Sequence, residues 1–161
     1  MLLAAGAFAL LLVPSMFAAP ASFATVARGV GVWSLPNFAA TTLETIGNTQ
    51  YIASYGNGPI TGGISGQTTA ALLLDVKTNT GVTVFTGQIE CVCTVSGRSG
   101  ILWIAITNGF DVNLNDPNGV TMGNLLIVGS SGALAGSSGT GFFNTTSSSA
   151  NMDYTMKIHL G

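Results

Sequence analysis

The chain has 161 residues, of which 47% are hydrophobic and only 6% are charged, and its formal net charge is −2. An ordinary soluble domain carries about 25% charged residues, and the hydrophobic content excludes a disordered chain. The four basic residues are far apart in the sequence, which excludes the clustered positive charge of a nucleic-acid-binding protein: Arg28, Lys77, Arg98 and Lys157. So little charge gives little repulsion between molecules, and it favours packing against copies of the same chain.

Residues 1–24 form an uncharged, apolar leader. A 12-residue apolar run, residues 2–13, ends at Pro14, and the small residues that follow are typical of signal-peptide cleavage sites. Two such sites place the start of the mature chain at Ser22 or Thr25. A retained membrane anchor is the alternative, although the run is short for a span of about 20 residues. No basic residue precedes the run, which departs from the usual signal peptide. We expect a secreted protein, found outside the cell or at its surface.

After the leader, segments of alternating polarity are separated by turn residues, and no segment has the period of a helix. The segments predicted as strands are 25–35, 42–55 with a break near Gly47, 67–77, 82–95, 101–107, 110–114, 120–128 and 152–160. Two glycine-rich stretches are predicted as loops, residues 56–66 and 129–141, and a short extended piece at residues 60–64 is an alternative within the first. Asn108-Gly109 is predicted as a tight turn.

The strands differ in how they are expected to pack. In the first segment the candidates for packing are Val26, Val30, Val32 and Trp33. Segments 67–77 and 82–95 form the clearest hairpin, and the apolar run 101–107 is typical of a strand buried on both faces. In the last segment one face is apolar and the other polar, with Tyr154, Met156, Ile158 and Leu160 on the apolar face.

These segments predict one all-β domain, residues 25–161. Seven to nine strands with frequent turns indicate an antiparallel closed barrel of about eight strands, or alternatively a β-sandwich. A barrel is favoured because open sheet edges in a chain with so little charge would promote aggregation.

The C-terminal half, about residues 66–160, resembles the barrel of allene oxide cyclases, dirigent proteins and a related bacterial family of unknown function. The stretches that carry the resemblance are 85–100 with its G-R-S-G turn, 126–136 (LIVGSSGALAG), 139–142 (GTGF) and 154–158 (YTMKI). The resemblance implies an eight-stranded antiparallel barrel with an apolar cavity. It transfers no catalytic residue, and Ser138 stands where many of those proteins have a basic residue.

Three neighbouring side chains are candidates for chemistry. Glu90 lies on a mostly apolar strand, and a carboxylate lining a cavity could act as an acid or base, although a solvent-facing carboxylate is the simpler interpretation. Cys91 and Cys93 point to the same side of that strand, at the upper limit of disulfide geometry. A strained local disulfide and an inert thiol pair are both open, and a bond between chains is a third alternative.

The remaining candidates are weaker. Asn144-Thr145-Thr146 is a sequon that makes Asn144 a candidate for glycosylation. His159 is the single histidine and is expected on the polar face of the last strand, without the partners that a catalytic triad needs. The oxygen-rich loop 111–118 is accounted for by turn chemistry without calcium. We therefore predict no catalytic residue, no metal site and no cofactor.

Two functions of different classes follow. The first is a non-catalytic extracellular protein, either a structural subunit that assembles with copies of itself or a small barrel that binds an apolar ligand. An extended segment such as 25–35 could then complete a neighbour's sheet. The alternative is a cyclase-like or dirigent-like barrel whose apolar cavity steers a reactive ligand.

Overall fold

The structure, a computed structural model, describes residues 25–113, 116, 118–146 and 149–161. The predicted leader, residues 1–24, lies outside the described residues. The described residues form nine strands: β1 (Thr25–Ser34), β2 (Asn37–Ile46), β3 (Thr49–Gly62), β4 (Ile64–Lys77), β5 (Thr83–Val95), β6 (Arg98–Asp111), β7 (Val120–Gly132), β8 (Ser138–Thr146) and β9 (Asn151–Leu160). Among these residues, no helix is long and apolar enough to cross a membrane.

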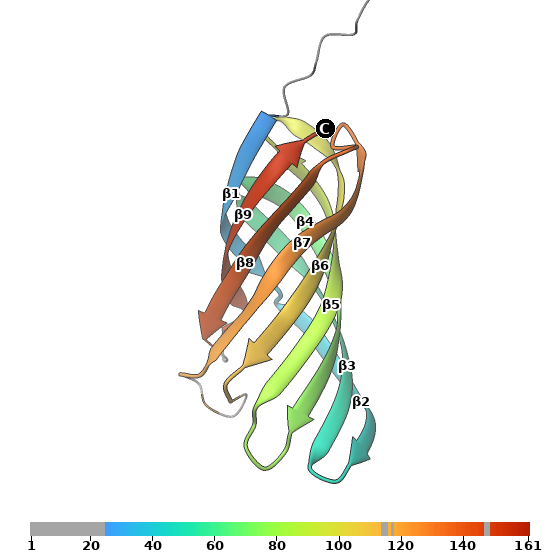
Figure 1. Cartoon of the computed structure of the whole chain (residues 1–161), viewed down its shortest axis with the longest axis vertical. Helices are drawn as coiled ribbons and strands as arrows, with labels where there is room; N and C mark the ends of the chain where they lie inside the picture. The colour runs from blue at the N-terminus through green and yellow to red at the C-terminus, as the bar shows by residue number, and fades with distance from the viewer. Residues whose placement is uncertain (1–24, 114–115, 117, 147–148) are drawn as a thin grey trace, which may run out of the picture.

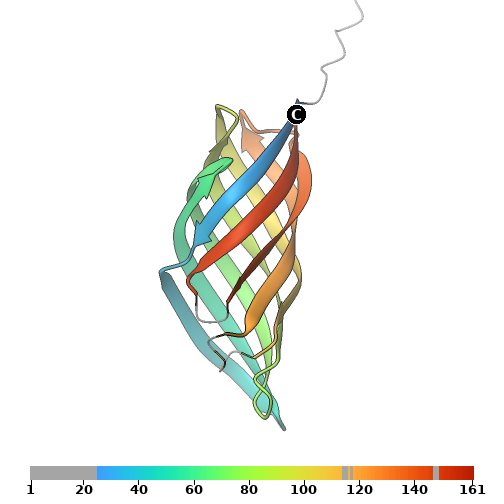
Figure 2. The same cartoon turned by 90° about the vertical axis from the view of Figure 1, so that its left-hand side faces the viewer.

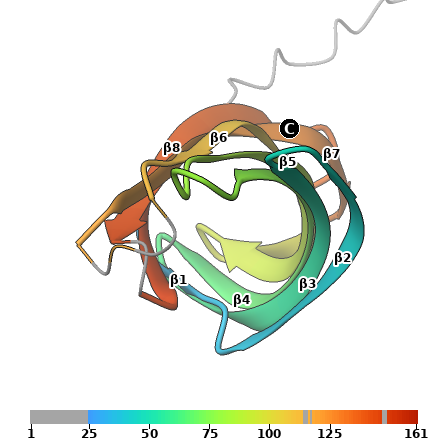
Figure 3. The same cartoon turned by 90° about the horizontal axis from the view of Figure 1, so that it is seen from below.

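Eight of the strands form a closed antiparallel barrel, as the sequence predicted (Figure 1). The strands follow one another from β3 to β9, and β1 then pairs with β9 along its whole length, from Thr25–Leu160 to Ser34–Asn151. β1 thus completes its own barrel rather than a neighbour's sheet, contrary to the strand donation considered for segment 25–35. β2 is an additional strand that pairs with β3 (Figure 3).

A short seam between β1 and β3 closes the ring. It consists of three residue pairs, Gly31–Gly62, Val32–Thr61 and Trp33–Ile60. The two backbones approach so closely that a Cβ at Gly31 would lie 1.9 Å from the carbonyl oxygen of Thr61. Gly62 has a φ of 102°, which side-chain-bearing residues rarely adopt. Below the seam, β2 takes the place of β1 along the same edge of β3.

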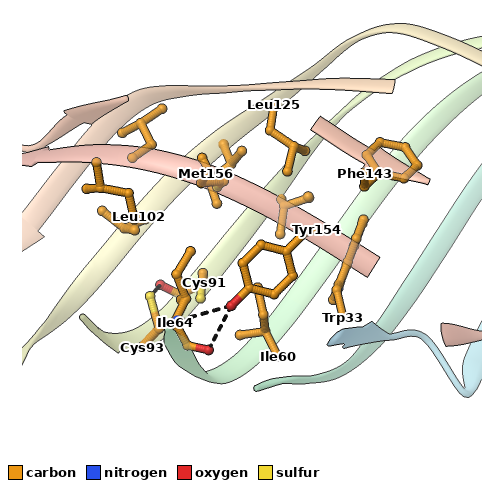
Figure 4. Close-up of a cluster of buried hydrophobic side chains, with 14 of the residues drawn as sticks. Trp33, Ile60, Ile64, Cys91, Cys93, Leu102, Leu125, Phe143, Tyr154 and Met156 are labelled. Atoms are coloured by element: carbon orange, nitrogen blue, oxygen red, sulfur yellow. Dashed lines mark hydrogen bonds between the residues drawn. The ribbon is translucent and has the colours of Figure 1, made fainter. Parts of the chain in front are cut away.

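The barrel interior is the hydrophobic core. Alternate side chains along each strand point inward (Figure 4). The apolar face predicted for the last strand is confirmed, because Tyr154, Met156, Ile158 and Leu160 are all buried. The predicted hairpin is formed by β4 and β5. In β6 the alternation leaves Trp103 36% exposed on the outer face, so the prediction of burial on both faces is wrong.

The packing face predicted for the first strand is also wrong. Its three valines face outward and are between 37% and 59% exposed: Val26, Val30 and Val32. Trp33 is buried, and the other inward positions carry small residues because neighbouring strands fill the space. A Cβ at Gly29 would lie 3.0 Å from Ile64 Cγ1 and 3.3 Å from the ring of Tyr154. Bulky residues of nearby strands thus require glycine where the sequence suggested an outward position.

The two glycine-rich stretches predicted as loops are largely strand. Residues 56–66 belong to β3 and β4, which are separated by Gly63 alone. Gly56 and Gly58 are inward positions, and a Cβ at Gly58 would lie 2.1 Å from the carbonyl oxygen of Ser34. Residues 129–141 likewise belong mostly to β7 and β8, and only residues 133–137 form the turn between them.

Asn108-Gly109 is not a turn, because β6 continues past it to Asp111. The pairing with β7 shifts register between Thr107 and Phe110, so the two residues form a bulge, and Asn108 has a φ of 52°. Residues 110 and 111 of the predicted antiparallel return strand are therefore the end of β6. The dipeptide correctly indicates a positive φ, here at Asn108. The chain does not reverse at this point, because β6 is paired with β5 on one side and with β7 on the other.

Candidate functional site

The two ends of the barrel differ. At the upper end, Leu134 from the β7–β8 turn is completely buried and joins the core. The lower end carries the β2–β3 and β4–β5 turns (Figure 1). It contains a cavity of about 410 Å³. Its apolar wall residues come from seven strands (β1, β2, β4, β5, β6, β8 and β9) and from the β1–β2 and β8–β9 links: Trp33, Leu35, Pro36, Phe38, Leu72, Leu74, Phe85, Ile106, Phe143, Ala150 and Met152. Side chains that are remote in the sequence therefore surround one apolar space.

Aromatic side chains close the inner end of this cavity, which we call its floor. They lie between the cavity and the filled core of the barrel. Trp33 and Phe143 meet edge to face, with ring centroids 6.1 Å apart and an interplanar angle of 89°. Phe85 lies on the other side of Phe143, with a centroid distance of 6.3 Å. The Trp33 Nε1–H donates to the Thr68 hydroxyl at 2.7 Å, which donates to the Gly58 carbonyl oxygen at 2.8 Å. The floor is thus held by ring packing and a buried hydrogen-bond relay.

The polar part of the cavity wall gathers around Asp111. This residue is 1% exposed, and its carboxyl group accepts hydrogen bonds from the Thr121 hydroxyl and from the Asn113 backbone N–H, the latter at 2.9 Å. These bonds tie the segment after β6 to the start of β7. Asp111 thus belongs to a hydrogen-bonded structural unit, and the hydroxyls of Thr83 and Thr145 add further polar atoms to the wall.

Glu90, the candidate for a cavity carboxylate, does not line the interior. Its neighbour Cys91 points inward, so strand alternation places Glu90 on the outer face, where it is exposed. There its carboxylate accepts a hydrogen bond of 3.1 Å from Trp103 Nε1 on β6. An outer-surface pair of this kind offers no enclosed acid or base.

Cys91 and Cys93 are both buried free thiols, and no disulfide joins them in this structure (Figure 4). The Cys93 thiol donates to the Cys91 carbonyl oxygen, with 3.3 Å between sulfur and oxygen. The hydrogen bond between the two thiols, together with burial, raises the pKa of Cys91 above its ordinary value. A protonated, enclosed thiol is a poor nucleophile and cannot reach a second chain.

Tyr154 provides the main polar anchor inside the upper core. Its hydroxyl accepts a hydrogen bond of 3.0 Å from the Ile64 backbone N–H (Figure 4). The same hydroxyl lies 2.9 Å from the Thr61 carbonyl oxygen, to which it donates. These contacts connect β9 to the β3–β4 turn past β1, which lies between β9 and β3 in the ring. Burial raises the pKa of Tyr154 above its ordinary value of 10.0, because the phenolate would be poorly solvated.

We expect Tyr154→Phe to lower the free energy of unfolding by about 1–3 kcal/mol at neutral pH, because the buried Ile64 N–H loses its acceptor. The raised pKa also makes the wild-type protein sensitive to alkali. Above pH 10 the unfolded chain releases the tyrosine proton more readily than the folded chain, so stability present below pH 10 is lost as the pH rises. Urea unfolding between pH 7 and pH 11 measures both effects. The variant should lose less stability than wild type over this interval, and equal losses would contradict the assignment.

The remaining candidates lie on the outer surface. Asn144 is exposed on β8, so the sequon is accessible. His159 faces outward on β9, between Val26 of β1 and Ser138 of β8. Its strand neighbours among the described residues are not the nucleophile and acid of a catalytic triad. Within residues 25–113, 116, 118–146 and 149–161, no three histidine, cysteine or acidic side chains are grouped as a metal site would require.

Comparison with known protein families finds no match to any part of the chain. No characterised protein matches the sequence either. The barrel and its cavity are therefore the observations from which a function must be argued. The resemblance implied an apolar cavity, but the sequence did not identify the residues that line it, because the wall is assembled from nearly every strand. The local sequence feature that pointed to the cavity wall was the run of apolar residues near the lower ends of the strands, such as Leu72 and Leu74.

Proposed function

We propose that the protein is an exported, non-catalytic barrel that binds a small apolar molecule in the cavity at its lower end. The cavity carries the proposal: its volume is about 410 Å³, and its wall is mostly aliphatic and aromatic. Small-molecule sites typically have volumes of about 300–1,000 Å³ and a few polar groups in an apolar wall. Export rests on the apolar leader in the sequence, residues 1–24.

The state of Asp111 favours binding over acid–base catalysis. Among the described residues, it is the acidic side chain that lines the cavity, and it is almost completely buried. It already accepts hydrogen bonds from Thr121 and Asn113. A carboxyl group engaged in this way holds the wall together, whereas a general acid or base must reach a substrate proton.

The wall also indicates the class of ligand. Aromatic and aliphatic side chains suit an apolar body. The Thr83 hydroxyl donates to the Gly81 carbonyl oxygen, and the Thr145 hydroxyl donates to that of Asn151. Both hydroxyls can still accept a hydrogen bond, which suits one polar substituent that donates, such as a hydroxyl or an amine. A ligand with several charges would lose its hydration without gaining partners. We therefore expect binding of a neutral, largely apolar molecule.

Fluorescence of N-phenyl-1-naphthylamine, an apolar probe with one N–H group, tests the proposal. We expect saturable binding at one site per chain, and about fivefold weaker binding for Phe38→Ala, because the variant removes half-buried apolar surface from the cavity wall. Phe38 is 47% exposed, so the substitution should hardly change stability.

Phe142→Ala is the matched control. Phe142 is 52% exposed, but it lies on the outer face of β8 and does not line the cavity. Binding should be the same as in the wild type. Absence of saturable binding, or equal weakening by both variants, would contradict a ligand site in the cavity. The titrations should be run at one low protein concentration, so that association between chains does not differ between variants.

The alternative, a cyclase-like or dirigent-like barrel that steers a reactive ligand, would use the same cavity. It rests on the resemblance of residues 66–160 and requires that a bound reactive molecule change its product distribution. Product analysis with and without the protein separates the two functions. Binding without a change in products supports the non-catalytic barrel.

A further inference from the structure

The outer edge of β2 is open. β2 pairs with β3 along one edge, and all ten of its residues are exposed. In the described part of the chain no strand pairs with its other edge, and Figure 2 shows β2 as the border of the sheet at the lower end. A row of unpaired backbone N–H and C=O groups is a template for another strand.

Most devices that protect such edges are missing from β2. The strand contains no lysine, arginine or proline, and Glu44 is its one charged residue. Its pairing with β3 shifts register between Thr42 and Glu44, so a bulge at Leu43 interrupts the edge. The regular, uncharged part of the edge is therefore residues 37–42.

We infer that this edge pairs with the same edge of a second copy of the chain, antiparallel, about a two-fold axis at Ala40. Such an axis stands perpendicular to the sheet, so Ala40 faces its own copy and Phe38 faces Thr42 of the partner. The small side chains of Ala40 lie at the axis. Beside them the aromatic Phe38 lies opposite the β-branched Thr42 of the second copy, and pairs of this kind stabilise neighbouring strands.

Charge supports a second copy as the occupant. In this register the two Glu44 residues are eight positions apart, or about 26 Å, so no like charges face each other. A register centred on Glu44 would oppose two carboxylates directly. The net charge of −2 adds little repulsion between whole molecules.

Residues 1–24 are a less suitable occupant of the edge. They join the barrel at Thr25, which pairs with Leu160 at the upper end, whereas β2 lies at the lower end. A segment of the same chain would have to return along the whole barrel to reach β2.

Cysteine cross-linking of the full-length chain tests the register. Ala39 and Ala40 are both exposed, and the native cysteines are buried, so engineered thiols react selectively. In Ala40→Cys the paired Cα atoms should be about 5 Å apart, and mild oxidation should give a disulfide-linked dimer. In the matched variant Ala39→Cys the equivalent atoms are about 8 Å apart, too far for a disulfide. Cross-linking of Ala39→Cys and not of Ala40→Cys would overturn the proposed register.

Light scattering tests the edge independently of cross-linking. The wild-type chain should become dimeric as its concentration rises, and Thr41→Lys should keep it monomeric, because a lysine on the edge opposes pairing. Thr140→Lys, an exposed change on β8, which is paired on both sides, should dimerise like wild type. A monomeric wild type, or a dimer that is insensitive to Thr41→Lys, would overturn the proposal. Some amides of residues 37–42 pair with β3 and are protected in either case. Slow hydrogen exchange in a monomer of the outward amides, which do not pair with β3, would also overturn the proposal, because another part of the chain would then cover the edge.

Discussion

Trp33→Ala is expected to lower the free energy of unfolding by about 3–5 kcal/mol, the range for removing a large aromatic side chain from a core. Trp33 is 2% exposed and packs edge to face against Phe143. The substitution also leaves the Thr68 hydroxyl without its Nε1–H donor. Urea unfolding followed by circular dichroism measures the loss without relying on tryptophan fluorescence.

The second tryptophan provides the control. Trp103 also donates its Nε1–H to a side chain, that of Glu90, but on the outer face, where it is 36% exposed. Trp103→Ala should cost about 1 kcal/mol or less, since an exposed hydrogen bond and partial burial are lost. Similar losses for the two variants would show that Trp33 is not the floor of the cavity. Trp33→Phe should fall between wild type and Trp33→Ala, because it keeps a ring against Phe143.

Gly31→Ala is expected to lower the free energy of unfolding by about 3 kcal/mol, because the new methyl group collides with backbone at the seam. Its Cβ would lie 1.9 Å from the Thr61 carbonyl oxygen and 2.9 Å from Gly62 Cα, and neither atom can rotate away. The seam has only three residue pairs, so a local shift affects all of it. Urea unfolding measures the loss, and hydrogen exchange at Val32 and Thr61 reports whether the seam has opened.

Gly129→Ala is the control for the seam variant. A Cβ at Gly129 would meet the Trp103 ring at 3.1 Å, and this half-exposed side chain can move. The control should remain within about 1 kcal/mol of wild type and leave exchange at the seam unchanged. A loss as large as that of Gly31→Ala would mean that added bulk, and not the close backbone approach, determines the effect.

The fold class was predictable because it depends on local alternation. The last strand shows this directly, since Tyr154, Met156 and Ile158 are all buried as expected. The same logic failed for β1, where valines face outward and glycines face inward. Inward glycine is required there because Tyr154 and Ile64 fill the interior from other strands, and that information is not local to β1.

The candidate site was harder to predict, for a related reason. Alternation along β5 already placed Glu90 on the face opposite to the two cysteines. Which of these faces is the interior depends on how the sheet closes. The cavity wall brings Trp33 and Phe38 together with Phe143, more than 100 positions later in the sequence. No local sequence pattern indicates that these residues line the same cavity, because their proximity depends on strand order and register.

The pairing of the first strand with the last also affects the order of events during folding. β1 finds its partner only when residues 151–160 have been made, so a growing chain holds β1 without its main neighbour throughout synthesis. The consecutive hairpins from β3 to β8 can form earlier, but the ring cannot close. Barrel closure is therefore a late step governed by contacts that are distant in sequence, which are slow to form. A chain that crosses a membrane before its last strand is complete would do so with an open sheet.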